Sequence, residues 1–162
     1  MKLTIIRHGI AVPSGAEGIA DDDRPLTNKG RRRFQEVARG LAEICERPDV
    51  LLTSPLPRAA ETAEIAAAAW GDVTPISELA LAQGSIDQIL ALLAKQAPDQ
   101  HVAIVGHEPT VSALLARLLG SGAGKRFAFR KGGVAHLDVP GTLSEGGQLE
   151  WFTRPRILRA LG

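Results

Sequence analysis

The sequence predicts an α/β fold of three layers, with helices on both faces of a central, mostly parallel β-sheet. Short apolar runs rich in β-branched residues alternate with segments that have the apolar period of a helix, a pattern typical of β-α units in a parallel sheet. Near the end of the chain, two runs with strand-like alternation are joined by a region rich in Gly and Pro. These two runs predict an antiparallel edge to the sheet.

Three of the predicted strands are followed directly by polar residues. They are Leu3 to Ile6 before Arg7-His8-Gly9, Val50 to Thr53 before Ser54-Pro55, and Val102 to Val105 before Gly106-His107. A shorter strand is expected at Val73 to Ile76 and leads to Glu78. Ligands of open parallel sheets bind beyond the carboxyl ends of the strands, so we expect these polar residues to share one edge.

Segments with helical period follow the predicted strands. The expected helices are Asn28 to Arg47 behind the N-cap Thr27, Pro57 to Trp70, Ser85 to Gln96, Pro109 to Leu119, and a short final helix that Arg154-Pro155 opens. The antiparallel edge is expected from Val134 to Val139 and from Gln148 to Thr153. We find no internal repeat or linker, and a single domain over residues 1–162 is the expectation.

Composition limits the class of protein. A chain of 162 residues with 44% hydrophobic residues can bury one compact core. Nineteen basic and eighteen acidic residues give a net charge of +1, too balanced to indicate nucleic-acid or anionic-membrane binding by bulk electrostatics. No stretch reaches the length of a membrane span, and Arg7-His8 interrupts the first apolar run, which predicts a cytoplasmic protein. We expect a monomer, and we interpret the single cysteine, Cys45, as a small buried residue.

The predicted edge collects side chains suited to phosphoryl chemistry. They are two histidines, two arginines and one carboxylate: Arg7, His8, Arg58, Glu78 and His107. A phosphate group brings about −1.5 to −2 charges, and planar guanidinium groups bind its oxygens in pairs. Ser54 is a further candidate through its hydroxyl, although a Ser-Pro pair also starts turns without any ligand.

Four blocks occur in a defined order along the chain. They are Leu3-Thr4-Ile5-Ile6-Arg7-His8-Gly9, then Arg24-Pro25-Leu26-Thr27-Asn28-Lys29-Gly30, then Ser54-Pro55-Leu56-Pro57-Arg58-Ala59 with Glu61-Thr62-Ala63, and Val105-Gly106-His107-Glu108-Pro109. Together they resemble the histidine phosphatase superfamily, the phosphoglycerate-mutase-like proteins. The match extends from Met1 to about Leu119. The short chain, without the insertions of mutases and larger phosphatases, looks most like the SixA-type phosphohistidine phosphatases.

The resemblance implies a role for four residues. It implies that His8 is a nucleophile that becomes phosphorylated, that Arg7 and Arg58 bind phosphate, and that His107 is the second histidine of the pocket. Neutral imidazole is a competent nucleophile when one ring nitrogen donates to a backbone carbonyl and the other is free, and a protonated His107 would add a donor. No metal or other cofactor is implied. The implied substrate is phosphohistidine on a protein, such as a histidine phosphotransfer domain.

The proton donor is where the sequence departs from the family pattern. Glu78 is only a candidate, because the fuller motif around such a carboxylate is not recognisable in Ile76 to Ala80. Glu108, beside His107, is a second possible proton donor. A carboxylate at a helix start is, however, more often a partner of the helix dipole or a cap. A missing acid favours a phosphoramidate, since imidazole can leave already protonated whereas an alcohol needs an acid.

Three other functions stay open on the sequence alone. The first is a phosphatase of a small phosphorylated metabolite, with Glu78 as general acid. The second is a non-catalytic adaptor that senses phosphate. The third is a metal-dependent hydrolase that uses both His8 and His107.

Several other polar residues receive no role in this interpretation. His101 and His136 are expected to be exposed or on an edge strand. Arg31 to Arg33 is expected to form a solvated helix face, although it could steer an acidic partner domain. Asp21 to Asp23 is interpreted as a solvated loop near the mouth of the pocket, since it lacks further ligands at a metal-binding spacing.

Overall fold

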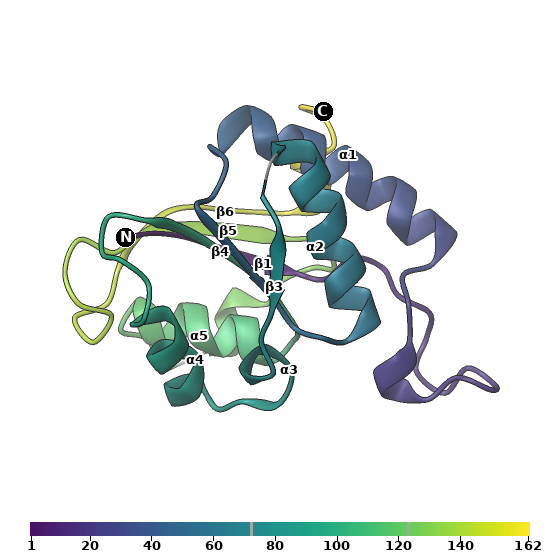
Figure 1. Ribbon diagram of the computed structural model, residues 1–162, viewed down its shortest axis with the longest axis horizontal. Helices are drawn as coiled ribbons and strands as arrows, with labels where there is room; N and C mark the ends of the chain where they lie inside the picture. The colour runs from purple at the N-terminus through teal and green to yellow at the C-terminus, as the bar shows by residue number, and fades with distance from the viewer. Residues whose placement is uncertain (72, 123) are drawn as a thin grey trace.

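The computed structural model describes residues 1–71, 73–122 and 124–162, and in them the predicted three-layer α/β fold is confirmed (Figure 1). The strands are β1 (Lys2–Arg7), β2 (Val50–Thr53), β3 (Pro75–Ser77), β4 (His101–Gly106), β5 (Val134–Asp138) and β6 (Gln148–Thr153). They form one sheet in the order β3-β2-β4-β1-β5-β6. Strands β1 to β4 are parallel, whereas β5 is antiparallel to β1 and β6 to β5, so the predicted antiparallel edge is confirmed.

Helices cover both faces of this sheet (Figure 1). One face carries α1 (Asn28–Ile44), α2 (Pro57–Trp70) and α6 (Pro155–Leu158), and the other carries α3 (Ala80–Gln83), α4 (Ile86–Leu93) and α5 (Thr110–Leu118). Two short 3-10 helices, η1 (Asp21–Asp23) and η2 (Gly124–Phe127), lie in loops. Among the described residues, no helix is both long and apolar enough to cross a membrane.

Most element boundaries differ from the sequence-based expectation by one to three residues and the short α3 was not expected, and two of the differences have a clear local reason. Helix α1 ends at Ile44 instead of Arg47, because a residue before a proline, here Pro48, disfavours the helical conformation. Strand β3 is Pro75–Ser77 instead of 73–76, because it pairs with β2 from Leu51 to Thr53 and both strands end together. This common end places Glu78 beside the carboxyl end of β2.

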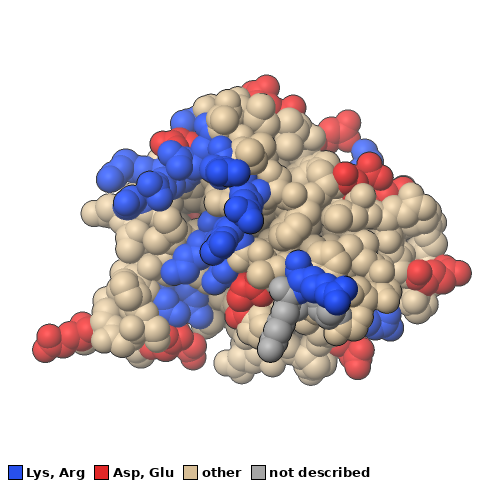
Figure 2. Space-filling model, turned by 180° about the vertical axis from the view of Figure 1, so that it is seen from behind, with Lys and Arg blue, Asp and Glu red and all other residues tan. Residues whose placement is uncertain are grey.

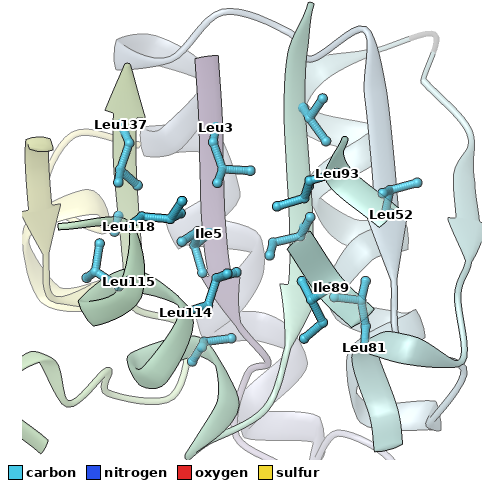
Figure 3. Close-up of a cluster of buried hydrophobic side chains, with 14 of the residues drawn as sticks. Leu3, Ile5, Leu52, Leu81, Ile89, Leu93, Leu114, Leu115, Leu118 and Leu137 are labelled. Atoms are coloured by element: carbon cyan, nitrogen blue, oxygen red, sulfur yellow. The ribbon is translucent and has the colours of Figure 1, made fainter. Parts of the chain in front are cut away.

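The sheet is buried on both faces by two apolar clusters. Alternation along β1 sends Leu3 and Ile5 toward α4 and α5, where they pack in the cluster of Figure 3, and sends Ile6 toward α1 and α2. Near-continuous apolar strands are what a parallel sheet between two helical layers requires. The carboxyl ends of β1, β2 and β4 are therefore held rigidly between the layers.

A buried polar network corrects the expectation for His101 and His136. His101 is only 6% exposed, and its Nε2 lies 2.8 Å from the Thr4 hydroxyl, as does Nδ1 of His136. His136 is not on an edge strand, because β6 covers β5 and Trp151 stacks on the imidazole with ring centroids 5.3 Å apart. Cys45 joins this network and is buried as predicted. The expectation that both histidines are exposed or on an edge strand was wrong, because Cys45, which follows α1, packs against His101 and β6 covers His136.

The start of α1 lies directly against the chain that follows His8. Thr27 is the N-cap, as predicted, and its hydroxyl accepts the Gly30 N–H at 2.9 Å. The Thr27 N–H donates to the Ile10 carbonyl at 3.0 Å. A Cβ on Gly30 would lie only 1.9 Å from the same Ile10 carbonyl oxygen. Only glycine permits this close approach, which fixes the loop after β1.

We expect Gly30→Ala to lower stability and to disturb the polar edge. Gly40→Ala is a matched control, since its Cβ would lie 1.9 Å from the Leu158 carbonyl oxygen, at α6 and away from that edge. Overpacking against the backbone should outweigh the helix-propensity gain of about 1 kcal/mol and destabilise both variants by about 2 kcal/mol in urea unfolding. Only Gly30→Ala should also weaken binding of inorganic phosphate measured by calorimetry. Equal phosphate binding in the two variants would contradict this role of Gly30.

Candidate active site

The ends of β1 and β4 place two histidines next to each other. The strands pair in parallel up to Arg7 and Gly106, and the His8 N–H then donates to the Gly106 carbonyl at 3.0 Å. His8 and His107 follow the last paired residues, and their ring centroids are 5.1 Å apart. Both side chains are buried, with His8 only 6% exposed. Residues separated by almost a hundred positions thus form one site.

Hydrogen bonds fix the orientation of the His8 ring. Its Nδ1 lies 2.7 Å from the Gly9 carbonyl oxygen, and because a carbonyl only accepts, Nδ1 carries the proton. Nε2 therefore retains its lone pair. The Gly9 N–H donates to the Thr62 hydroxyl at 3.0 Å, which in turn donates to the Arg58 carbonyl at 2.6 Å. The end of β1 is thereby tied to the first turns of α2.

The Ser54 hydroxyl is the hydrogen-bond partner of one ring nitrogen of His107. The Ser54 hydroxyl oxygen accepts the Leu56 N–H at 3.2 Å and lies 2.8 Å from Nε2 of His107. With its oxygen engaged as an acceptor, the hydroxyl is free to donate its single proton to Nε2. When the hydroxyl donates to Nε2, the proton of a neutral His107 ring is on Nδ1. Nδ1 is buried and has no hydrogen-bond partner in the described part of the chain.

Two guanidinium groups are each held by one backbone carbonyl. Nη1 of Arg7 donates to the Phe129 carbonyl at 2.5 Å, and Nη1 of Arg58 donates to the Asp21 carbonyl at 2.9 Å. The Nε atoms of both arginines are buried without a partner among the described residues. Buried donors are normally paired. Three such donors at one edge, the two Nε atoms and Nδ1 of His107, indicate a site for an anion.

Burial and positive neighbours keep both histidines neutral near pH 7. Burial lowers the pKa of His8 to about 3; the Gly9 carbonyl opposes this, and His107, Arg58 and Arg7 lower it further. Burial also lowers the pKa of His107 to about 4, with added effects from Arg58, Arg24 and Arg7. The expectation of a protonated His107 therefore does not hold for the unliganded protein. The neutral ring can still donate through Nδ1.

Arg24 belongs to the site although the sequence analysis assigned it no role. Its Nε lies 2.9 Å from the Asp21 carboxylate, and its Nη1 donates to the Val12 carbonyl at 2.7 Å. Its charge lowers the pKa of His107 and of Arg58. Arg24 comes from a loop and not from a strand end, so strand patterning could not find it. Its place in the second sequence block was the available signal.

The two candidate carboxylates have different surroundings. The Glu78 N–H donates to the Thr53 carbonyl at 2.8 Å, which places Glu78 beside Ser54, and its side chain makes no hydrogen bond or ion pair in the described structure. Oε1 of Glu108 accepts from the Ser112 hydroxyl at 2.6 Å and from the Phe129 N–H at 2.7 Å. Glu108 therefore holds the loop whose carbonyl binds Arg7, and α5 begins instead at the N-cap Pro109.

Among the described residues, one group of three has side chains of the kind that bind metal ions, with their ligand atoms close together. The ligand atoms of Cys45, His101 and His136 lie within 4.8 Å of one another. The Thr4 hydroxyl lies 2.8 Å from a ring nitrogen of each histidine, so these nitrogens already have a partner. The group lies toward the amino end of the parallel strands and does not include His8 or His107.

Comparison with known proteins identifies the class. The profile of the histidine phosphatase superfamily (branch 1) matches residues 3–83. An uncharacterised protein of Picosynechococcus sp. is 36% identical over 140 residues, which are 85% of this chain and 84% of that protein. The chain belongs to the histidine phosphatase superfamily, and it is a hydrolase of the phosphatase class.

Solved structures place the chain more narrowly. A protein assigned as the phosphohistidine phosphatase SixA of Nakamurella multipartitia is 28% identical, with a TM-score of 0.80 over 95% of each chain. One so assigned from Agrobacterium tumefaciens is 26% identical, with a TM-score of 0.81 over 95% of this chain and 97% of that chain. The protein histidine phosphatase SixA complexed with tungstate is 25% identical, with a TM-score of 0.80 over 98% of this chain and 99% of that chain. The chain is of the SixA type.

We expect the free energy of unfolding to fall as the pH drops from 7 to 5. The folded-state pKa of His8 lies below that of an unfolded histidine, about 6.5, so the unfolded state binds more protons in this range. The stability is fully present above pH 6.5 and is lost as the pH falls toward the folded pKa. His8 accounts for at most about 2 kcal/mol of this loss.

His8→Asn tests this origin of the pH dependence. Asparagine can still donate to the Gly9 carbonyl but does not titrate. Urea unfolding at pH 7, 6 and 5 should therefore give a smaller loss of stability for the variant than for the wild-type protein. Parallel curves for the two proteins would show that the titration of His8 does not contribute.

Proposed function

We propose that this protein hydrolyses phosphohistidine on a partner protein through a covalent phospho-His8 intermediate, without a metal ion. The observation that supports the proposal most is the set of three unpartnered buried donors at the same strand edge as His8, whose Nε2 is free. A tetrahedral anion with its phosphorus in front of Nε2 would satisfy Nε of Arg7, Nε of Arg58 and Nδ1 of His107 together.

In the first step, the lone pair of His8 Nε2 attacks phosphorus. A new N–P bond forms, and the P–N bond to the substrate imidazole breaks and leaves its electron pair on that imidazole, which carries a proton. The guanidinium groups of Arg7 and Arg58 stabilise the charge on the phosphoryl oxygens. The low pKa of His8, about 3, keeps the nucleophile unprotonated at neutral pH.

In the second step, water attacks the phosphorus of phospho-His8. The N–P bond breaks, its electron pair returns to Nε2, and the proton lost by water is taken up by the phosphate product or by solvent. The His8 proton stays on Nδ1, hydrogen-bonded to the Gly9 carbonyl, throughout, so the ring returns to its starting tautomer. Arg24 adds positive potential behind His107 and Arg58.

The surroundings of the nucleophile favour a phosphoramidate substrate over an ester. No carboxylate is hydrogen-bonded to either active-site histidine in the described structure, and Glu108 is engaged with Ser112 and Phe129. An alkoxide leaves slowly without an acid, whereas a protonated imidazole needs none. The similarity to SixA proteins, one of them in complex with the oxyanion tungstate, agrees with this substrate class.

Phosphorylation of His8 is directly testable. Incubation with a ³²P-labelled phosphohistidine donor and rapid quenching should label the wild-type protein with phosphate that is acid-labile and stable in base. His8→Asn should abolish the label, while His136→Gln, which changes a buried histidine remote from the site, should retain it. Absence of label from folded wild-type protein, together with absence of turnover, would favour the phosphate-sensing adaptor.

A second candidate function is hydrolysis of a small phosphate monoester, and the position of Glu78 is the observation that favours it. Its side chain is unpaired and follows a strand that ends beside Ser54. If Glu78 protonates an alkoxide, Glu78→Gln should lower kcat/KM for a sugar phosphate by about a hundredfold or more.

We expect phosphohistidine, and not a phosphate ester, to be the better substrate. The wild-type protein should prefer free phosphohistidine to sugar phosphates in kcat/KM, and Glu78→Gln should change phosphohistidine hydrolysis by less than about threefold, because the leaving imidazole needs no acid. Steady-state phosphate release on both substrates measures this preference. A clear preference for the ester that Glu78→Gln removes would overturn the assignment of phosphohistidine as the substrate.

A further inference from the structure

The active-site edge opens onto a surface that carries an excess of basic side chains. We define the basic strip as six exposed residues: Arg33, Arg126, Arg130, Lys131, Arg154 and Arg156. Figure 2 shows Lys and Arg gathered in a band on one face of the molecule, with few acidic side chains beside it. The whole chain has a net charge of only +1, so the strip is a local concentration of charge.

Two hollows bring members of the basic strip together with the chain neighbours of His8. A hollow of about 180 Å³ is lined by Gly9, the residue after His8, and by Arg33, Lys131 and Arg156. A larger hollow of about 630 Å³ is lined by Arg7 and by three further members of the strip, which are Arg126, Arg130 and Arg154. Each hollow therefore contains a direct sequence neighbour of the proposed nucleophile.

Most of the positive charge of the strip has no acidic partner among the described residues. Glu108 is the one acidic residue that lines either hollow, and its Oε1 already accepts from Ser112 and Phe129. The six side chains make no hydrogen bond or salt bridge with other described residues. Like charges held together repel one another, so an acidic surface laid against the strip would relieve this repulsion.

The fold fixes part of the strip to the catalytic strand. The N–H of Gly132, whose φ is +78°, donates to the carbonyls of both Arg7 and His8, at 3.1 and 3.0 Å. The Arg7 N–H donates in return to the Gly133 carbonyl at 3.1 Å. The turn that carries Arg130 and Lys131 is thus bonded to the residues that perform the proposed chemistry, and its charges hold a constant position relative to them.

We propose that the basic strip docks an acidic surface of the protein that carries the phosphohistidine. This inference rests on the proposed function and identifies its partner by charge. The strip extends across α1, the turn before β5 and the end of β6, which is more than a single phosphate group would contact. A nucleic acid or a membrane carries no phosphohistidine and would not need the hollows beside the strip to include Arg7 and Gly9. Complementary charge would raise the association rate and align the phosphohistidine with His8.

Charge reversal within the strip tests the inference. The variant Lys131→Glu/Arg156→Glu changes two exposed residues outside the proposed catalytic set. The control Arg47→Glu/Lys95→Glu makes the same change of charge in the loops before β2 and β4, at the opposite end of the parallel strands. The two substrates are free phosphohistidine and a chemically phosphorylated histidine phosphotransfer domain of net negative charge.

The measured quantity is the ratio of two kcat/KM values, the one for the protein substrate divided by the one for free phosphohistidine. We expect this ratio to be about tenfold lower in the strip variant than in the wild-type protein at low ionic strength. The control should retain the wild-type ratio. For the wild-type protein, kcat/KM on the phosphotransfer domain should fall as salt rises, and this dependence should be weaker in the strip variant. Free phosphohistidine should show little salt dependence in either protein.

Three outcomes would overturn the inference. The first is an unchanged ratio in the strip variant, and the second is an equal fall in the control. The third is binding of duplex DNA or of phosphatidylserine vesicles that the strip variant loses while the ratio stays constant. In all three, wild-type hydrolysis of free phosphohistidine leaves the proposed function intact. If the wild-type protein hydrolyses neither substrate, the proposed function fails and the inference with it.

Discussion

The parallel register between β1 and β4 is the constraint on which the site depends. Six residue pairs, from Lys2 with His101 to Arg7 with Gly106, bring both strands to the same edge. A slip of one residue would turn every side chain of β1 to the other face of the sheet and remove His8 from His107. Both faces are covered by helices, so such a slip would also expose Leu3 and Ile5 to a different layer. Packing of the core and alignment of the two imidazoles are therefore one requirement.

Burial at this edge has two consequences that support each other. Removing two imidazoles from water among three guanidinium groups disfavours their protonation, which keeps Nε2 of His8 available as a nucleophile. The same burial leaves guanidinium N–H groups of Arg7 and Arg58 without partners, a cost that an anion would offset. These unsatisfied donors are the physical basis of the proposed anion site.

Sequence reasoning identified the residues at strand ends and missed those that come from loops. Arg7, His8, Ser54 and His107 follow directly from apolar runs that stop, and the ordered blocks added Arg58. The position of Arg24 and the use of the Phe129 carbonyl by Arg7 depend on loop paths that no periodicity records. The basic strip was hidden for a related reason, since its members are scattered over 33–156 and are balanced in composition by acidic residues elsewhere.

Strand ends and loops contribute different parts of the proposed activity. In the proposed mechanism, the rigid edge holds the groups that act on phosphorus, so a change there would affect the chemistry of any substrate. The turn before β5 links the strand edge to the surface. Gly132 in this turn is hydrogen-bonded to Arg7 and His8, and its neighbours Arg130 and Lys131 are exposed. In the proposed docking, a partner surface that binds those two side chains is placed through the same turn that is hydrogen-bonded to Arg7 and His8. Docking of the partner and alignment of its phosphohistidine are then a single event.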